Sequence, residues 1–116
     1  MSNIHKWVGR QFVSSTTKTR EFMAFCRDFK SFVKENLPPG AELVKYNSGH
    51  FYVSGFIRRG NNYVYFSTPD VRFSHWPCQI LVRRAANDKD FTGGVNYYAN
   101  CDNFRFIIDE LLGQWV

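Results

Sequence analysis

Asp70, Arg72 and His75 lie close together in the sequence and carry side chains with which enzymes attack phosphate esters. A guanidinium neutralises a phosphate, an imidazole or carboxylate moves a proton, and a second carboxylate would complete a site for phosphodiester chemistry. Arg83 and the segment 89–94 are the further residues that such an enzyme would use. Ordinary salt bridges in a connecting loop explain the same residues more simply. We therefore expect a protein without catalytic residues and keep a small enzyme acting on a phosphodiester or nucleotide as the alternative.

A second group of residues combines aromatic rings with positive charge and indicates binding rather than catalysis. Aromatic rings on a sheet stack with bases, and arginine or lysine neutralises phosphates. Tyrosine is also common in strands because it packs well on a pleated surface, so a purely structural role stays open. The candidate binding residues are Tyr52, Phe56, Arg58, Tyr63, Tyr65, Arg72, His75, Arg83 and Lys89.

Other patterns that could indicate catalysis or metal binding are incomplete. His50 and Ser54 would be roughly 13 Å apart along one strand, which is too far for a hydrogen bond. The segment 88–94 begins like a calcium-binding loop, but Ala99 stands where the bidentate glutamate belongs. The three histidines and three cysteines show no zinc-ligand spacing. We therefore expect no cofactor and no metal.

Two segments with helical periodicity must position these residues. Apolar side chains recur at the spacing of one helical face through residues 20–36, and Pro38-Pro39-Gly40 ends that helix. Phe104, Ile107, Ile108 and Leu111 repeat in the same way and predict a last helix over residues 103–113.

Between the helices the sequence predicts strands at 42–46, 50–59, 62–68 and 79–84, followed by a long loop at 86–101. Gly60-Asn61 fits a two-residue hairpin loop, which places Arg58 opposite Tyr63 and Phe56 opposite Tyr65. One face of this hairpin is then apolar and the other carries the candidate binding residues. The order α-β-β-β-β-α predicts an α+β two-layer sandwich, with a four-stranded antiparallel sheet and two helices on one face. The second face would be open, or covered by the N-terminal segment and the 86–101 loop.

The predicted core of this sandwich comes from both helices and the apolar face of the hairpin. A side chain that points from a helix toward a sheet, or from a sheet toward a helix, is expected to be buried. The residues predicted to be buried are Phe22, Phe25, Phe29, Ile57, Phe66, Ile107 and Leu111.

Length and charge bound the kind of protein. A chain of 116 residues with 44% hydrophobic and 18% aromatic residues predicts one folded domain over 1–116, and no apolar run is long enough to cross a membrane. The net charge is +5, and residues 1–60 alone carry +6. We predict a basic N-terminal arm at about 1–18, which would suit a phosphate backbone or an acidic protein groove; a leader that only improves solubility is the simpler alternative.

The three cysteines, Cys26, Cys78 and Cys101, are an odd number at spacings that match neither a disulfide framework nor a redox pair. We therefore expect unpaired thiols and a reducing compartment. The first ten residues lack the apolar core of a secretory signal, which also favours the cytoplasm.

The segments 44–56, 63–72 and 89–94 resemble a group of small uncharacterised proteins that phages and conjugative elements of Gram-positive bacteria carry. The resemblance covers about residues 12–110. It implies a mobile-element protein of the anti-defence kind, such as an anti-CRISPR inhibitor, and no active-site residue. Together with the basic and aromatic residues, it predicts a non-enzymatic inhibitor in the host cytoplasm, whose partner is a host protein such as a CRISPR effector, or nucleic acid.

Overall fold

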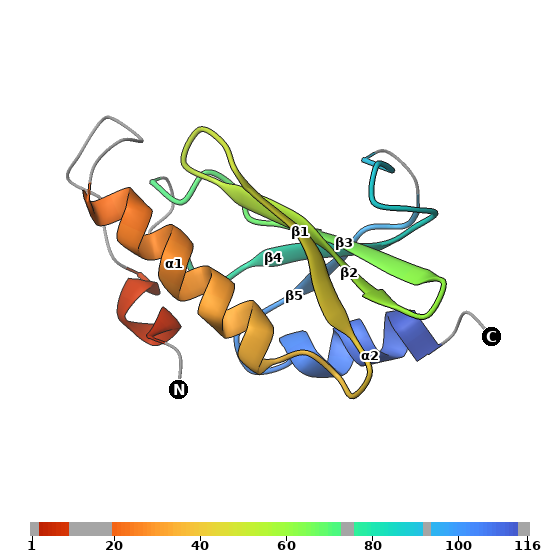
Figure 1. The fold of residues 1–116 in the computed structure, drawn as a ribbon. Helices are drawn as coiled ribbons and strands as arrows, with labels where there is room; N and C mark the ends of the chain where they lie inside the picture. The colour runs from red at the N-terminus through yellow and green to blue at the C-terminus, as the bar shows by residue number, and fades with distance from the viewer. Residues whose placement is uncertain (1–2, 10–19, 73–75, 92–93, 114–116) are drawn as a thin grey trace.

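The computed structural model describes residues 3–9, 20–72, 76–91 and 94–113 and has an α+β architecture (Figure 1). A five-stranded antiparallel sheet packs against two helices. Within the described ranges, no helix has the length and apolar content needed to cross a bilayer. The elements are η1 (Ile4–Trp7), α1 (Arg20–Glu35), β1 (Glu42–Ser48), β2 (Val53–Arg59), β3 (Asn62–Ser67), β4 (Ile80–Ala85), β5 (Tyr97–Ala99) and α2 (Phe104–Gly113).

The strands form a meander in which each pairs with the next, in the order β1-β2-β3-β4-β5. The predicted hairpin register is confirmed: Arg58 lies opposite Tyr63 and Phe56 opposite Tyr65. The predicted strand at 50–59 starts later, at Val53, because the chain turns just before it. The Gly49 amide donates a 2.8 Å hydrogen bond to the Tyr52 carbonyl, and Phe51 has a positive φ of 60°.

The fifth strand, β5, corrects the prediction of a four-stranded sheet and of a loop through 86–101. Its three residues pair with β4, with Ile80 opposite Ala99 and Val82 opposite Tyr97. So short a strand, between Asn96 and Asn100, carries no alternating pattern of its own. Pairing with β4 makes it a strand, and that is a tertiary interaction.

Cys78 and Cys101 form a disulfide bond, so the expectation that all three cysteines are unpaired is wrong. The reason lies in the sheet register: two residues beyond the Ile80–Ala99 pair, the same antiparallel alignment places Cys78 opposite Cys101. The bond therefore continues the β4–β5 ladder, and it was missed because β5 was missed. Cys26 is a free, half-buried thiol.

Both helices pack on the same face of the sheet, as predicted (Figure 1). Phe66 in β3 contacts Phe29 of α1 and Phe104 of α2, with ring centroids 6.1 and 6.3 Å apart. The two helices also meet directly through Phe32 and Phe104, at 5.3 Å. Of the side chains predicted to be buried, Ile107 alone is partly exposed.

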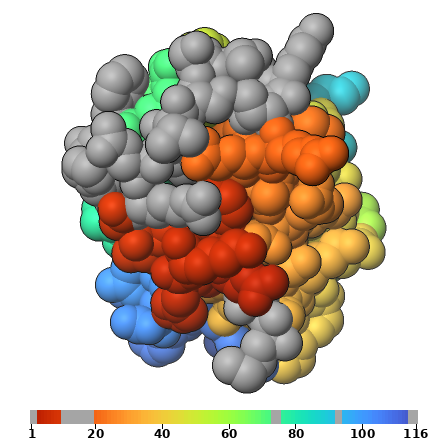
Figure 2. All heavy atoms as spheres, turned by 90° about the vertical axis from the view of Figure 1, so that its left-hand side faces the viewer, coloured from red at the N-terminus to blue at the C-terminus, as the bar shows by residue number. Residues whose placement is uncertain are grey.

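The start of the chain packs onto α1 (Figure 2). Trp7 is buried with its ring edge on Phe25, and its Nε1 donates a 2.8 Å hydrogen bond to the Asp28 carboxylate. Lys6 lies 3.4 Å from the same carboxylate. The first part of the predicted basic arm is thus attached to the domain, whereas Arg10 and Lys18 lie outside the described residues.

Replacing Phe29 by alanine should lower the free energy of unfolding by about 3–5 kcal/mol, because its fully buried ring leaves a cavity between α1 and β3. Met23→Ala on the same helix, where the side chain is about half exposed, is the matched control and should cost far less. Equal losses in chemical denaturation would contradict the described packing of α1.

Removing the disulfide with the double variant Cys78→Ala/Cys101→Ala should cost about 3 kcal/mol, because the unfolded chain regains the freedom of a 23-residue separation. Adding dithiothreitol should lower the free energy of unfolding of the wild type by a similar amount. It should leave the free energy of unfolding of the double variant unchanged. If the reductant does not change the unfolding midpoint of the wild type, the disulfide bond is not formed in solution.

Candidate functional site

The sheet face opposite the helices carries one row of side chains that crosses four strands. Lys45 of β1 lies opposite Phe56 of β2, Phe56 lies opposite Tyr65 of β3, and Tyr65 lies opposite Arg83 of β4. Because side chains on directly opposed residues point to the same side, this row is two rings with a cation at each end. We call the whole surface, with the adjacent Arg58 and Tyr63, the aromatic-basic face.

Phe91, from the loop between β4 and β5, packs on this row. Its ring centroid lies 5.2 Å from that of Phe56 and 5.9 Å from that of Tyr65, and both contacts are edge-on. Phe56 and Tyr65 also contact each other at 5.3 Å. We call these three rings the aromatic cluster. Phe56, which was predicted as a binding residue, is fully buried beneath this cluster and offers a partner no exposed surface, whereas Phe91 remains 48% exposed.

Lys45 and Arg83 are the flanking cations of the aromatic cluster. The Lys45 Nζ lies 5.9 Å from the ring centroids of both Phe56 and Phe91, and the Arg83 guanidinium lies 4.5 Å from that of Tyr65. Such cation–π geometry holds a positive charge against the face of a ring, and both cations are partly exposed. Sequence reasoning missed Lys45 because a bulge between Leu43 and Lys45 sets which side of β1 it faces.

The hydrogen bonds of the flanking cations go to neutral oxygens. Lys45 donates to the Asp88 carbonyl at 3.0 Å, and Arg83 donates to the Phe91 carbonyl and, at 3.4 Å, to the Asn96 side chain. Neither cation forms an ion pair with a carboxylate in the described part of the chain. The loop is thereby held on the sheet, and neither positive charge is paired with a carboxylate of the described residues.

Arg58 and Tyr63 form the next row of the aromatic-basic face. Arg58 makes an ion pair with Glu42 of β1, and hydrogen bonds to Tyr63 and Glu42 raise its pKa further above the usual range. Both partners are solvent-exposed, so this pair contributes little to stability. Its consequence is that Arg58 offers less free charge than Lys45 or Arg83.

Arg72 lies apart from the aromatic cluster, in the connection after β3, where it reaches the turn before β2. Its guanidinium stacks 4.2 Å from the Phe51 ring centroid, makes two hydrogen bonds to the Asp70 carboxylate at 2.8 and 3.1 Å, and contacts the His50 Nε2 at 3.1 Å. Arg72 thereby links the connection after β3 to the turn before β2. The hydrogen bond from Arg72 lowers the pKa of Asp70 below its ordinary value.

The other predicted binding residues are dispersed. The exposed ring of Tyr52 rests on Gly49, where even a β-carbon would collide with it. Lys89 is exposed in the loop after β4, and His75 lies outside the described residues. The predicted set therefore divides into the aromatic-basic face, the Arg72 turn and isolated positions.

Those residues of the enzyme hypothesis that the structure describes do not assemble into one site; His75 and residues 92–93 lie outside the described ranges. Asp70 and Arg72 bind each other, and Arg83 has a separate set of partners on the aromatic cluster. Among the described residues, no cluster of three or more histidine, cysteine, aspartate or glutamate side chains could hold a metal ion. Burial raises the pKa of the Cys26 thiol to about 11, which disfavours the nucleophilic thiolate.

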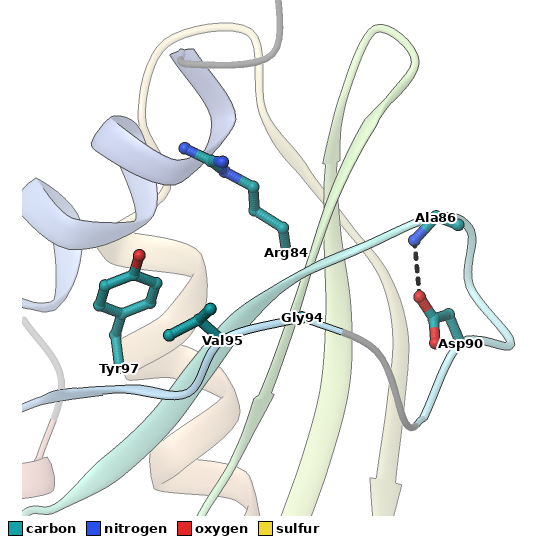
Figure 3. A pocket seen from close by; sticks show the side chains of 6 residues that line it. All are labelled: Arg84, Ala86, Asp90, Gly94, Val95 and Tyr97. Atoms are coloured by element: carbon teal, nitrogen blue, oxygen red, sulfur yellow. Dashed lines mark hydrogen bonds between the residues drawn. The ribbon is translucent and has the colours of Figure 1, made fainter.

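An open hollow of about 450 Å³ lies beside the loop between β4 and β5 (Figure 3). It is lined by Arg84, Ala86, Asp90, Gly94, Val95 and Tyr97. Arg84 points from β4 toward α2, while the Asp90 carboxylate turns back and accepts a 2.9 Å hydrogen bond from the Ala86 amide. The chain crosses β4 closely at Gly94, where a β-carbon would lie 2.8 Å from the Arg84 carbonyl and φ is +85°. Only glycine fits this crossing easily.

No protein-family model, no curated protein and no solved structure matches this chain. The site therefore has to be interpreted from its own chemistry.

Replacing Asp70 by asparagine should lower the free energy of unfolding by less than about 1 kcal/mol, because the pair with Arg72 is partly exposed. The folded-state pKa of Asp70 is lowered, so its stabilising effect is present above the unfolded-state pKa of about 3.9 and is lost as pH falls through the lower folded value. Denaturation at neutral pH should therefore separate wild type from variant, and the two curves should converge in strong acid. A difference that stays constant down to acid pH would contradict the ion pair.

Proposed function

We propose that this chain is a non-enzymatic binding protein that uses its aromatic-basic face to inhibit a nucleic-acid-handling defence system of a bacterial host. The observation that carries the proposal is the pair of cations, Lys45 and Arg83, which lie on either side of the aromatic cluster and form no ion pair with a carboxylate among the described residues. Positive charge without such a partner is available to neutralise a phosphate or a carboxylate of a partner molecule.

The aromatic cluster adds contact area at the same place. Phe91 is half exposed between the two cations, and Tyr63 and Tyr65 are partly exposed beside it. A ring flanked by cations suits an anionic partner with a flat or apolar group next to its charge, which describes both nucleotides and an acidic protein surface. The net charge of +5 would increase the rate of encounter with such partners.

A host protein such as a CRISPR effector is the partner we favour, because the segments on this face resemble small proteins of phages and conjugative elements. The enzyme alternative has less support, since Arg72 donates its hydrogen bonds to the Asp70 carboxylate and both side chains are therefore already engaged with each other. Action in the host cytoplasm belongs to the same proposal. A reducing cytosol opens most disulfides, so the Cys78–Cys101 bond would have to resist reduction there or be dispensable.

The double variant Lys45→Gln/Arg83→Gln should weaken partner binding roughly tenfold or more while the protein remains folded. The measurement is capture of host proteins and nucleic acids from a bacterial lysate by immobilised protein, followed by the salt dependence of the captured complex between about 50 and 200 mM. The matched control is Arg27→Gln/Lys34→Gln, which removes the same charge from exposed positions of α1.

Nuclease treatment of the lysate separates the two kinds of partner. Capture that survives nuclease identifies a protein, and capture that disappears identifies nucleic acid. Equal capture by the two double variants would contradict a role for the flanking cations. Cleavage of added nucleic acid by the wild type, lost in Asp70→Asn, would replace the proposal with the enzyme alternative.

A further inference from the structure

The two edges of the sheet are built differently. The outer strand β1 carries Glu42 and Lys45 and a bulge, which are features that protect an edge from pairing with another strand. The other outer strand, β5, has none of them, because its residues are Tyr97, Tyr98 and Ala99 and its register with β4 is regular. Within the described residues, β5 pairs with β4 alone. One side of its backbone is therefore available to another strand.

The surroundings of β5 are apolar and exposed. Tyr98 is 57% exposed and Val95 68%, and Phe106 on α2 is 65% exposed. Between β5 and α2 there is a hollow of about 230 Å³ lined by Tyr97, Tyr98, Ile107, Glu110 and Leu111. β5 is only three residues long, which limits how far another strand can pair with it, but exposed apolar residues around an edge without charges or a bulge are typical of an interaction surface.

We propose that a second copy of this chain occupies this edge, with the two β5 strands pairing antiparallel about a two-fold axis. This inference is independent of the aromatic-basic face and its partner. Electrostatics favours a second copy over an acidic partner, because residues 91–101 contain no charged side chain that could attract one. Copies of a protein with a net charge of +5 repel each other, and that repulsion is weakest where an uncharged edge meets its own counterpart.

The sequence of the edge suits pairing with itself. Asn96, Tyr97, Tyr98, Ala99 and Asn100 read similarly in both directions. Pairing centred on Tyr98 places each Tyr97 opposite the small Ala99 of the other copy and each Asn96 opposite Asn100, so that only neutral side chains face each other. Within the paired strands, no like charges are brought together.

The two-fold axis also fixes where the helices go. Pairing that joins the two sheets into one continuous sheet requires an axis perpendicular to it, so both pairs of helices lie on the same side. Each α2 then approaches the other, with the hollow beside β5 at the junction and the exposed Phe106 on the same helix. The contact therefore has a strand layer and a helix layer.

The area available predicts a weak dimer. The exposed parts of Tyr97, Tyr98 and Phe106 add up to the order of 300 Å², against about 800 Å² that each partner buries in a standard interface. Val95, the β5 backbone and neighbouring α2 side chains supply part of the remainder. We therefore expect micromolar association that dilution reverses.

Sedimentation velocity of the full chain across a dilution series tests this. The wild type should shift from dimer to monomer on dilution, and Tyr98→Lys should be monomeric at concentrations where the wild type is dimeric, because a lysine on the edge opposes pairing. Asn47→Lys places the same charge on the opposite edge, β1, and should associate like the wild type. The near-ultraviolet circular dichroism of each variant shows whether it is folded.

A covalent test fixes the register. In a Cys26→Ser background, Tyr98→Cys should form an intermolecular disulfide with oxidised glutathione, because directly opposed residues in an antiparallel pair have Cβ atoms about 4.5–5.5 Å apart. Asn47→Cys in the same background should remain monomeric. Both cysteine variants retain the disulfide bond between Cys78 and Cys101.

A wild type that remains monomeric at the highest concentration reached would overturn the proposal. So would a dimer that Tyr98→Lys does not weaken, or a cross-link no faster at Tyr98→Cys than at Asn47→Cys. A monomeric wild type whose Tyr98→Lys variant loses a captured host protein would show that a strand of another protein occupies the edge instead. None of these results depends on Lys45 or Arg83, so they are distinct from a failure of the proposed function.

Discussion

The fold depends on how the Phe66 ring is placed in the centre of the sheet. Phe66 contacts aromatic rings of three other elements, at Phe29, Tyr46 and Phe104. It can do so because its partner across the hairpin is Gly55, where a β-carbon would lie 2.7 Å from the Phe66 ring and would also collide with the backbone of β1. An absent side chain on one strand thus makes the space in which a large one on the next strand connects the sheet to both helices.

This arrangement uses the apolar side chains on one face of the sheet and leaves the other face to shorter and more local contacts. That second face is not simply open: the loop after β4 returns across it and places Phe91 on Phe56 and Tyr65. Ordering such a loop reduces its conformational entropy. Hydrogen bonds from two cations to its carbonyl groups hold it in place, in addition to the ring contacts of Phe91. Because these bonds go to carbonyl groups, neither cation is paired with a carboxylate among the described residues, and the side chains that hold the loop are also those of the candidate site.

How much the sequence could predict follows from the range of the interactions involved. The β2–β3 register followed from Gly60-Asn61 and the alternation beside it, and the buried face of α1 from its phenylalanine spacing, because both signals are local. Arg58 and Tyr63 were placed correctly on one face for the same reason. The burial of Phe56 was not predicted, because the Phe91 ring that packs on it comes from a loop far along the chain. The Cys78–Cys101 bond needed the β4–β5 register, which no periodicity in a three-residue strand could show.

The meander gives this protein a particular order of assembly. Every strand pairs with its neighbour in sequence, so the sheet can begin to form while the chain emerges from the ribosome. The second helix, at residues 104–113, covers part of the apolar face of that sheet and contacts the first helix through Phe32 and Phe104. Because this helix is synthesised after all five strands, that part of the apolar face is exposed until it has been made, and chaperones bind such exposed apolar surface.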